Sequence, residues 1–326
     1  MIQPSDIFTI SGQKQFDKTA LKVFRYQYEN NPVYRQFCEL LHTDAAQVKT
    51  VQQIPFLPIQ FFKSHQVLTG TAAIQQTFTS SGTSGIQRSK HHVTDISLYE
   101  DSYRKAFAAS YGNIADYTIL ALLPSYLERD GSSLIYMVQD LIAMSGHTDS
   151  GFYLDDHEAL VQKLIALDNA GQQVLLIGVT YALLDLIETH SFALRNTIIM
   201  ETGGMKGRRK EMIREELHEV LCKGFGVSAI HSEYGMTELL SQAYSLGNGI
   251  FECPPWMQLL IRDTEDAMAY TGIAKTGGIN VIDLANINSC AFIATQDLGK
   301  RYADNTFEVL GRFDNSDIRG CNLMVL

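Results

Sequence analysis

Continuous apolar runs alternate with amphipathic segments through the middle of the chain. The runs are YTILALLP at 117–124, VLLIGV at 174–179 and NTIIMETGG at 196–204. Short runs of this kind predict strands buried on both faces. The segments 132–146, 181–190 and 207–226 carry apolar residues at helical spacing. They predict helices, two of which are expected to stop at Gly146 and Gly224. Buried strands separated by helices indicate βαβ units and a largely parallel sheet.

The two ends of the chain have other patterns. A helical region is expected over Asp17–Leu41 with an interruption at Pro32, and an extended, turning segment over 51–65. After residue 250, short strand patterns follow one another without helices between them, at 256–263, 277–285, 290–297 and 307–312. We therefore expect an α/β body over 1–250, with mixed or parallel sheets flanked by helices, and a small β-rich subdomain over 251–326.

Composition narrows the class of protein. The chain has 326 residues, of which 45% are hydrophobic and 19% charged, as in a globular protein. Its net charge of −10 argues against a nucleic acid or an anionic membrane surface as the main partner. We see no secretory signal and no membrane span. An odd number of widely spaced cysteines favours reduced thiols in the cytoplasm over disulfides or a zinc site; they are Cys38, Cys222, Cys253, Cys290 and Cys321.

The segment TSSGTSG at 79–85 is the most unusual stretch of the sequence. A run of hydroxyls and glycines can be a flexible turn, or a cradle in which hydroxyls and close backbone N–H groups hold a phosphate. It lies between two extended segments, and no helix is expected at its end. It also lacks the lysine-containing ending of a Walker loop, so the hydroxyls themselves would have to bind the anion.

Four motifs in order resemble those of the adenylate-forming enzymes. They are TFTSSGTSG at 77–85, ETGG at 201–204, YGMTE at 234–238, and TQDLG at 295–299 with GRFD at 311–314. Together with IPFLPIQFFKSH upstream of the loop, they resemble most closely the LuxE-like acyl-protein synthetases. The likeness covers most of the chain from about residue 50 onward. Each motif alone is common, but their order and spacing are specific.

The resemblance implies ATP and a carboxylic acid, expected to be a fatty acid, as the reactants, with Mg²⁺ as the cofactor. Adenylation joins the acid to the α-phosphate and expels pyrophosphate, so charge on the phosphates must be neutralised. Thr237 would contact the α-phosphate, and Glu238 would offer a hard oxygen ligand to Mg²⁺. The implied phosphate-loop residues are Thr79, Ser80, Ser81, Gly82, Thr83, Ser84 and Gly85.

The same resemblance assigns the nucleoside. Gly203, Gly204, Tyr234 and Gly235 would form the adenine slot, whereas Asp297 and Arg312 would hold the ribose. Taken singly, each residue has an ordinary structural reading: Tyr234 as a core aromatic, Glu238 as a helix cap and Asp297 as a turn residue.

Two departures from the wider superfamily concern catalysis. The loop continues IQRSK instead of Pro-Lys, and the chain ends soon after GRFD, where a mobile lid with a catalytic lysine would normally begin. We therefore expect the lid to be absent, with Lys63, Arg88, Lys90 or Arg129, or a partner protein, as substitutes. The terminal segment holds Cys321 beside Arg319, which points to an acyl acceptor. The alternative for Cys321 is a small core residue.

The expected function is ATP-dependent activation of a carboxylic acid as acyl-AMP, with transfer to a protein thiol. One alternative is a CoA ligase similar to the phenylacetate-activating enzymes, for which CoA would be the acceptor. Another is a degenerate nucleotide- or acyl-binding partner. An acyl reductase, an acyltransferase or an acyl-carrier protein are the expected partners. The residues near 121–138, including Tyr126 and Ser133, would line the acyl site.

Overall fold

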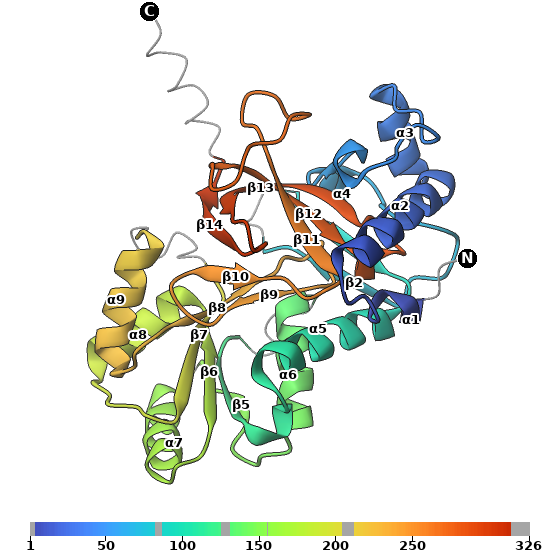
Figure 1. Ribbon diagram of the computed structural model, residues 1–326. Coiled ribbons are helices and arrows are strands. Elements are labelled where there is room, and N and C mark those ends of the chain that lie inside the picture. Colours follow the sequence, from blue (N-terminus) through green and yellow to red (C-terminus); the bar gives the residue numbers. More distant parts are fainter. Residues whose placement is uncertain (1–3, 82–86, 125–130, 155, 204–211, 314–326) are drawn as a thin grey trace, which may run out of the picture. The chain divides into compact units, whose positions relative to one another are not determined.

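The computed structural model describes residues 4–81, 87–124, 131–154, 156–203 and 212–313. The chain divides into two compact units, which we describe separately (Figure 1). The first combines residues 1–76, 91–95 and 255–326, and the second combines residues 77–90 and 96–254. Thus the N-terminal segment belongs with the C-terminal strands. The division at residue 250 into a body and a subdomain stays a prediction.

The first unit is an antiparallel sheet with helices from the N-terminal segment. Its strands run in the order β11-β12-β13-β14, and β1 pairs in parallel with β13. The helices are α1 (Pro4–Ile7), α2 (Gln13–Asn30), α3 (Pro32–Leu40) and α4 (Phe61–Ser64), and the strands are β1 (Leu57–Pro58), β11 (Met257–Arg262), β12 (Gly277–Asp283), β13 (Phe292–Arg301) and β14 (Phe307–Arg312).

The break at Pro32 is confirmed. Asn31 between α2 and α3 is extended, and its side chain accepts a hydrogen bond from the N–H of Tyr34, so it caps α3. The extended segment expected over 51–65 contains two short helical turns, a 3-10 turn at its start (Val51–Gln53) and α4 after Pro58. The four strands expected after residue 250 are all present.

The second unit has the alternating pattern that the sequence predicts. Its strand order is β10-β9-β8-β7-β6-β4-β5, with parallel pairs from β8 to β5 and antiparallel pairs at β8-β9 and β9-β10. The strands are β4 (Thr118–Leu122), β5 (Gly151–Phe152), β6 (Val174–Gly178), β7 (Thr197–Glu201), β8 (His231–Tyr234), β9 (Ala243–Ser245) and β10 (Ile250–Glu252). The helices are α5 (Ile96–Tyr111), α6 (Ser133–Ser145), α7 (His157–Asn169), α8 (Thr180–Thr189) and α9 (Arg214–Phe225). The Ser/Gly segment is flanked by β2 (Gln76–Thr79), which belongs to the second unit from Thr77 onward, and by β3 (Lys90–Val93), which belongs to the first unit from His91 onward.

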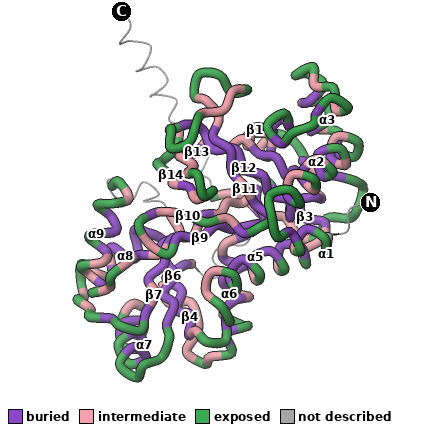
Figure 2. Tube along the Cα trace, viewed as in Figure 1, coloured by how far each residue is buried: buried purple, intermediate pink, exposed green. Residues whose placement is uncertain are grey.

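Helices cover both faces of this parallel sheet. Figure 1 shows α5 and α6 on one side of the strands and α7, α8 and α9 on the other. Every residue of β4 and β6 is buried, which is why these strands are continuous apolar runs (Figure 2). Among the helices of the described residues, none has the length and apolarity required to cross a bilayer.

One predicted helix end is wrong. The helix ending at Gly146 is confirmed, since that residue has φ 68° after α6. Gly224, however, lies inside α9, which continues to Phe225 and ends at Gly226, with φ 71°. Gly224 is helical because α9 packs tightly on α8: a Cβ at this position would lie 2.6 Å from Cβ of Ile187. The glycine therefore serves close helix packing and not termination.

Candidate active site

The carboxyl ends of the parallel strands carry several of the predicted residues. β7 and β8 are parallel neighbours, with Glu201 opposite Ser232. Gly203 follows the end of β7, and Gly235 follows Tyr234 at the end of β8. Parallel strands bring the residues that follow them to one edge of the sheet, which is where α/β proteins usually bind ligands. The ETGG and YGMTE motifs, 30 residues apart in sequence, therefore meet.

The described part of the phosphate loop is anchored within the same unit. The N–H of Thr79 donates to the carbonyl of Gly131, 2.7 Å away. The N–H of Ser80 donates to the carbonyl of Ser89, and the Ser80 hydroxyl accepts from the N–H of Ser89 at 3.0 Å. Gly131 lies between β4 and α6, so the loop begins beside the carboxyl end of another parallel strand. Ser81 is exposed.

Thr237 and Glu238 lie in a tight turn after β8, where the N–H of Leu239 donates to the carbonyl of Met236. The described chain has no helix at this point, so Glu238 is not a helix cap. Glu238 is only 5% exposed, and Tyr234 is also buried. In the described residues no group of three or more His, Cys, Asp or Glu side chains could hold a metal ion. Mg²⁺ in proteins usually keeps phosphate and water oxygens among its ligands, so a single protein carboxylate can suffice for it.

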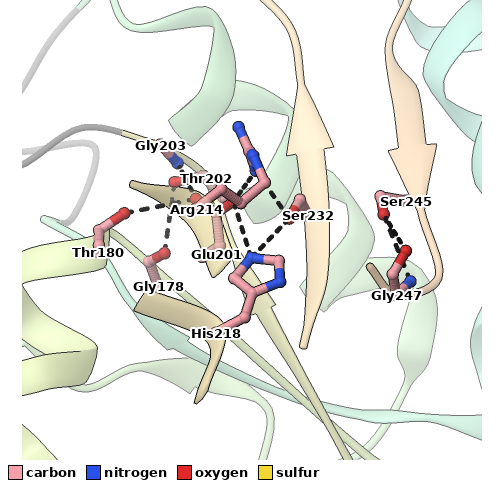
Figure 3. Close-up of polar contacts among 10 residues, drawn as sticks. All are labelled: Gly178, Thr180, Glu201, Thr202, Gly203, Arg214, His218, Ser232, Ser245 and Gly247. Carbon is pink, nitrogen blue, oxygen red and sulfur yellow. Dashed lines mark hydrogen bonds and ion pairs between the residues drawn. The ribbon is translucent and has the colours of Figure 1, made fainter. Parts of the chain in front are cut away.

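A buried ionic network supports the glycine segment after β7 (Figure 3). The Arg214 guanidinium lies 2.6 Å from Oε1 of Glu201, and Nε2 of His218 lies 3.8 Å from the same atom. The other carboxylate oxygen, Oε2, accepts from the N–H of Gly203 at 2.7 Å. Arg214 and His218 are four residues apart on α9, so they lie on one face of that helix. The Glu201 side chain thus fixes the backbone of Gly203.

The electrostatics of this network favour an ionised Glu201. Burial alone would raise its pKa. Hydrogen bonds from His218 and Ser232, the charge of Arg214 and the N–H of Gly203 outweigh burial and lower the pKa to about 2. The sequence analysis did not identify Arg214 and His218. Their spacing of four residues on a predicted amphipathic helix indicates that they share one helix face, but it does not indicate that both contact Glu201.

Asp297 and Arg312 lie in the first unit, on neighbouring strands. They are directly opposite each other on β13 and β14, and Nε of Arg312 donates to Oδ1 of Asp297 at 3.2 Å. Asp297 is buried, whereas the Arg312 side chain is 81% exposed. The structure therefore brings the two predicted ribose-binding residues together. Their motifs, DLG and GRFD, are adjacent through strand pairing.

Some predicted residues lie outside the described ranges. They are Gly82, Thr83, Ser84, Gly85, Gly204 and Cys321, together with Tyr126 and Arg129. In the second unit, the described residues predicted to bind the nucleotide or the metal are Thr79, Ser80, Ser81, Gly203, Tyr234, Gly235, Thr237 and Glu238; the candidate basic residues Arg88 and Lys90 and the acyl-site residue Ser133 are described there as well.

Known proteins resemble this chain over nearly its full length. The profile of the family described as acyl-protein synthetase, LuxE, matches residues 2–326. A long-chain-fatty-acid–luciferin-component ligase from Vibrio harveyi is 24% identical over 340 residues, covering 97% of this chain and 89% of that protein. Its counterpart from Aliivibrio fischeri is 23% identical over 352 residues, covering 99% of this chain and 91% of that protein.

Solved structures of adenylate-forming ligases have the same fold. A 2-hydroxyisobutyryl-CoA ligase in complex with its acyl-AMP superposes with a TM-score of 0.64 and 12% identity, covering 93% of this chain and 68% of that one. ATP-bound MatB from Rhodopseudomonas palustris has a TM-score of 0.55 and 15% identity, covering 74% of this chain and 49% of that one. These likenesses confirm the predicted fold class.

The sequence motifs, the α/β fold and the match along the whole chain agree. The predicted class of enzyme, an adenylate-forming ligase that activates a carboxylic acid and transfers it to a protein, is confirmed at the level of the family. The chain belongs to the acyl-protein synthetase family, LuxE.

Proposed function

We propose that this chain uses ATP and Mg²⁺ to convert a fatty acid to acyl-AMP and then passes the acyl group to a cysteine thiol. The adenylate-forming class is that of its family. The acid, the metal and the acceptor are proposals for this chain. The related Vibrio harveyi protein, named a ligase of long-chain fatty acids, supports the choice of acid.

The main support for this proposal is that motifs far apart in sequence lie at the same edge of the parallel sheet. Gly203, Tyr234 and Gly235 follow or end adjacent parallel strands, and we assign them to the adenine. The hydroxyls of Thr79, Ser80 and Ser81, with the rest of the loop to Gly85, would bind the β- and γ-phosphates. Asp297 and Arg312 would bind the ribose. Thr237 would contact the α-phosphate, close to where the acid must bind for direct attack.

Glu238 is the residue that we assign to Mg²⁺. It is a buried carboxylate in the turn after β8, and its hard oxygen suits this metal. The ion would supply charge neutralisation on the phosphates during displacement of pyrophosphate.

Three of the four described cysteines make poor acyl acceptors. Burial raises the pKa of the Cys38 thiol to about 12 and raises that of Cys290 still further, and it also raises the pKa of Cys222. A thiol that stays protonated is a weak nucleophile. This leaves Cys253, which is partly exposed, and the predicted acceptor Cys321.

Pyrophosphate exchange with a panel of carboxylic acids tests the activation step. An adenylating enzyme returns labelled pyrophosphate into ATP only when a suitable acid is present. Exchange that no acid stimulates would favour the degenerate binding partner and overturn the proposal.

Acyl labelling tests the acceptor. Cys321→Ser should retain exchange but lose hydroxylamine-labile labelling of the protein by a radioactive acid, whereas Cys253→Ser should retain both. Undiminished labile labelling of Cys321→Ser would refute this acceptor. Release of acyl-CoA on addition of CoA would instead support the CoA-ligase alternative.

The cellular compartment of the enzyme and its partner proteins are also proposals. No disulfide joins the four cysteines that the structure describes, which supports a reducing compartment such as the cytoplasm. A thioester product calls for a partner that consumes it, and we propose an acyl reductase, an acyltransferase or an acyl-carrier protein.

A further inference from the structure

The face of β8 and β9 opposite the Glu201 network carries a second set of polar side chains. Glu233 and Tyr244 are directly opposite each other across the antiparallel pair β8-β9. Side chains in such positions lie on the same face with their Cβ atoms close together. His231 and Gln242 precede them by two residues, so they lie on this face as well. We call Glu233, Gln242 and Tyr244 the polar triplet.

An aromatic stripe of α5 covers this face. Its members are four residues apart along the helix and so lie on one side of it: Tyr99, Tyr103, Phe107 and Tyr111. The ring centroid of Tyr244 lies 5.3 Å from that of Tyr111 and 6.4 Å from that of Phe107. The Tyr111 hydroxyl lies 3.1 Å from Nδ1 of His231, so that pair is satisfied internally. The polar triplet therefore lies in aromatic surroundings.

The polar triplet lacks hydrogen-bond partners in the described chain. The Tyr244 hydroxyl and Oε1 of Gln242 are buried without one, in residues that are 4% and 3% exposed. The Glu233 carboxyl group, which is partly exposed, takes part in no hydrogen bond or ion pair among the described residues. A buried polar atom left unpaired costs about 1–3 kcal/mol, and such atoms are rare in folded proteins. Two such atoms on one face, beside the partly exposed Glu233 carboxyl group, indicate that their partner is a ligand.

The polar triplet also lies beside the proposed reaction centre. A Cβ on Gly235 would collide with Oε1 of Glu233 and lie 3.3 Å from Cγ of Gln242. Both side chains thus contact the backbone of Gly235, two residues before Thr237, our assigned contact to the α-phosphate. Glu233 and Gly235 are partly exposed, so a ligand can reach them. The acyl group must extend from the α-phosphate, and this face is adjacent to it.

The charge state of Glu233 indicates what kind of group it binds. Burial and the charge of Glu201 raise its pKa to about 8. The carboxyl group is then largely neutral at pH 7 and can both donate and accept a hydrogen bond. Together with a phenol and an amide oxygen, it suits a neutral group that also donates and accepts, which is a hydroxyl.

We propose that the polar triplet binds a hydroxyl group on the acyl chain, and hence that the substrate is a hydroxylated carboxylic acid and not an unsubstituted fatty acid. This inference rests on the proposed function for the location of the acyl group. Its test must therefore separate binding of the acid from its activation.

Calorimetric titration of the protein with matched acids, in the presence of AMP, measures binding alone. The panel consists of unsubstituted alkanoic acids of six to twelve carbons, the same acids with a hydroxyl at carbon 2, carbon 3 or the terminal carbon, and amino acids of equal length. At least one hydroxylated acid should bind about tenfold to a hundredfold more tightly than its unsubstituted counterpart, because only the former satisfies the buried polar atoms.

Three substitutions connect this preference to the polar triplet. Tyr244→Phe removes a hydroxyl that has no described partner, so the protein should stay as stable as the wild type or become more stable, and the preference should fall about tenfold. Tyr117→Phe is the matched control, since the Tyr117 hydroxyl donates to the Tyr111 carbonyl at 3.0 Å; it should retain the preference. Glu233→Leu should also lose the preference, and Glu233→Gln should keep most of it.

The possible outcomes distinguish the two proposals. Equal binding of hydroxylated and unsubstituted acids, or a preference that Tyr244→Phe leaves unchanged, would overturn this inference even if exchange is rapid. Tightest binding of an amino acid would overturn it in favour of a cationic substituent. A hydroxyl preference without acid-dependent exchange would support the inference and refute the proposed function.

Discussion

Replacing Glu201 by Gln removes the charge at the centre of the buried network but keeps the size of the side chain and its acceptor oxygen. A carboxyl group whose pKa falls from 4.5 in the unfolded chain to about 2 in the folded one stabilises the protein by about 3 kcal/mol at pH 7. The cost of breaking a buried ion pair, about 3–5 kcal/mol, is consistent with this value. We therefore expect Glu201→Gln to lose about 3 kcal/mol of unfolding free energy at pH 7.

The pH dependence of this loss identifies its cause. The pKa is lower in the native state, so the stabilisation is complete above pH 4.5 and is lost as the pH falls towards 2. The difference between the wild type and Glu201→Gln should shrink to roughly 1.5 kcal/mol at pH 3. Urea denaturation followed by far-ultraviolet circular dichroism at pH 7 and pH 3 measures it.

The matched control is Glu158→Gln. Glu158 lies 3.8 Å from His190, but its side chain is 80% exposed, and such pairs contribute little. The unfolding free energy of the Glu158→Gln protein should stay within about 0.5 kcal/mol of that of the wild type at both pH values. A loss of less than 1 kcal/mol for Glu201→Gln, or one that is the same at both pH values, would refute the account of a charged network.

Three further predictions concern the site and the packing around it. Glu238→Gln should abolish Mg²⁺-dependent pyrophosphate exchange with an unchanged melting temperature, and undiminished turnover would remove Glu238 from the site. Thr83→Val should weaken ATP binding without loss of stability; a lower melting temperature with intact affinity would indicate a structural turn. Gly224→Ala should lower stability by about 1–3 kcal/mol through overpacking against Ile187, and Ile187→Ala in the same chain should reverse part of that loss in a double-mutant cycle. A gain of stability in Gly224→Ala would show that α8 and α9 separate at little cost.

Local patterns were sufficient to predict part of the second unit, namely β4, β6 and β7 with the helices α6, α8 and α9, but not α5, α7 or the remaining strands of its sheet. Runs such as VLLIGV are buried on both faces because helices cover both faces of a parallel sheet, so composition and structure agree. The end of α9 was misassigned because a glycine near a helix end has two physical uses. Only the position of Ile187 on another helix decides between them.

Two other features could not be read from the sequence because they depend on pairing between distant segments. The amide of Gln27 donates to the carbonyls of Asn286 and Ile287, about 260 residues away, and joins the N-terminal helices to the C-terminal strands. The pairing of Glu233 with Tyr244 depends on the register of β8 and β9. The motifs predicted which residues belong to the site, but not the contacts that support them.

Because the first unit is built from both ends of the chain, it can fold only late in synthesis. Its N-terminal part leaves the ribosome first, but its partner strands begin roughly 180 residues later, at Pro255. At about 5–20 residues per second, the N-terminal helices wait roughly 10–40 s for those strands. Most of the second unit, residues 96–254, is contiguous and can fold during that interval. Until β11 to β14 are made, the apolar face of α2 that buries Phe16, Val23 and Phe24 in the finished protein lacks its final partner. Chaperones would therefore act first on the beginning of this chain.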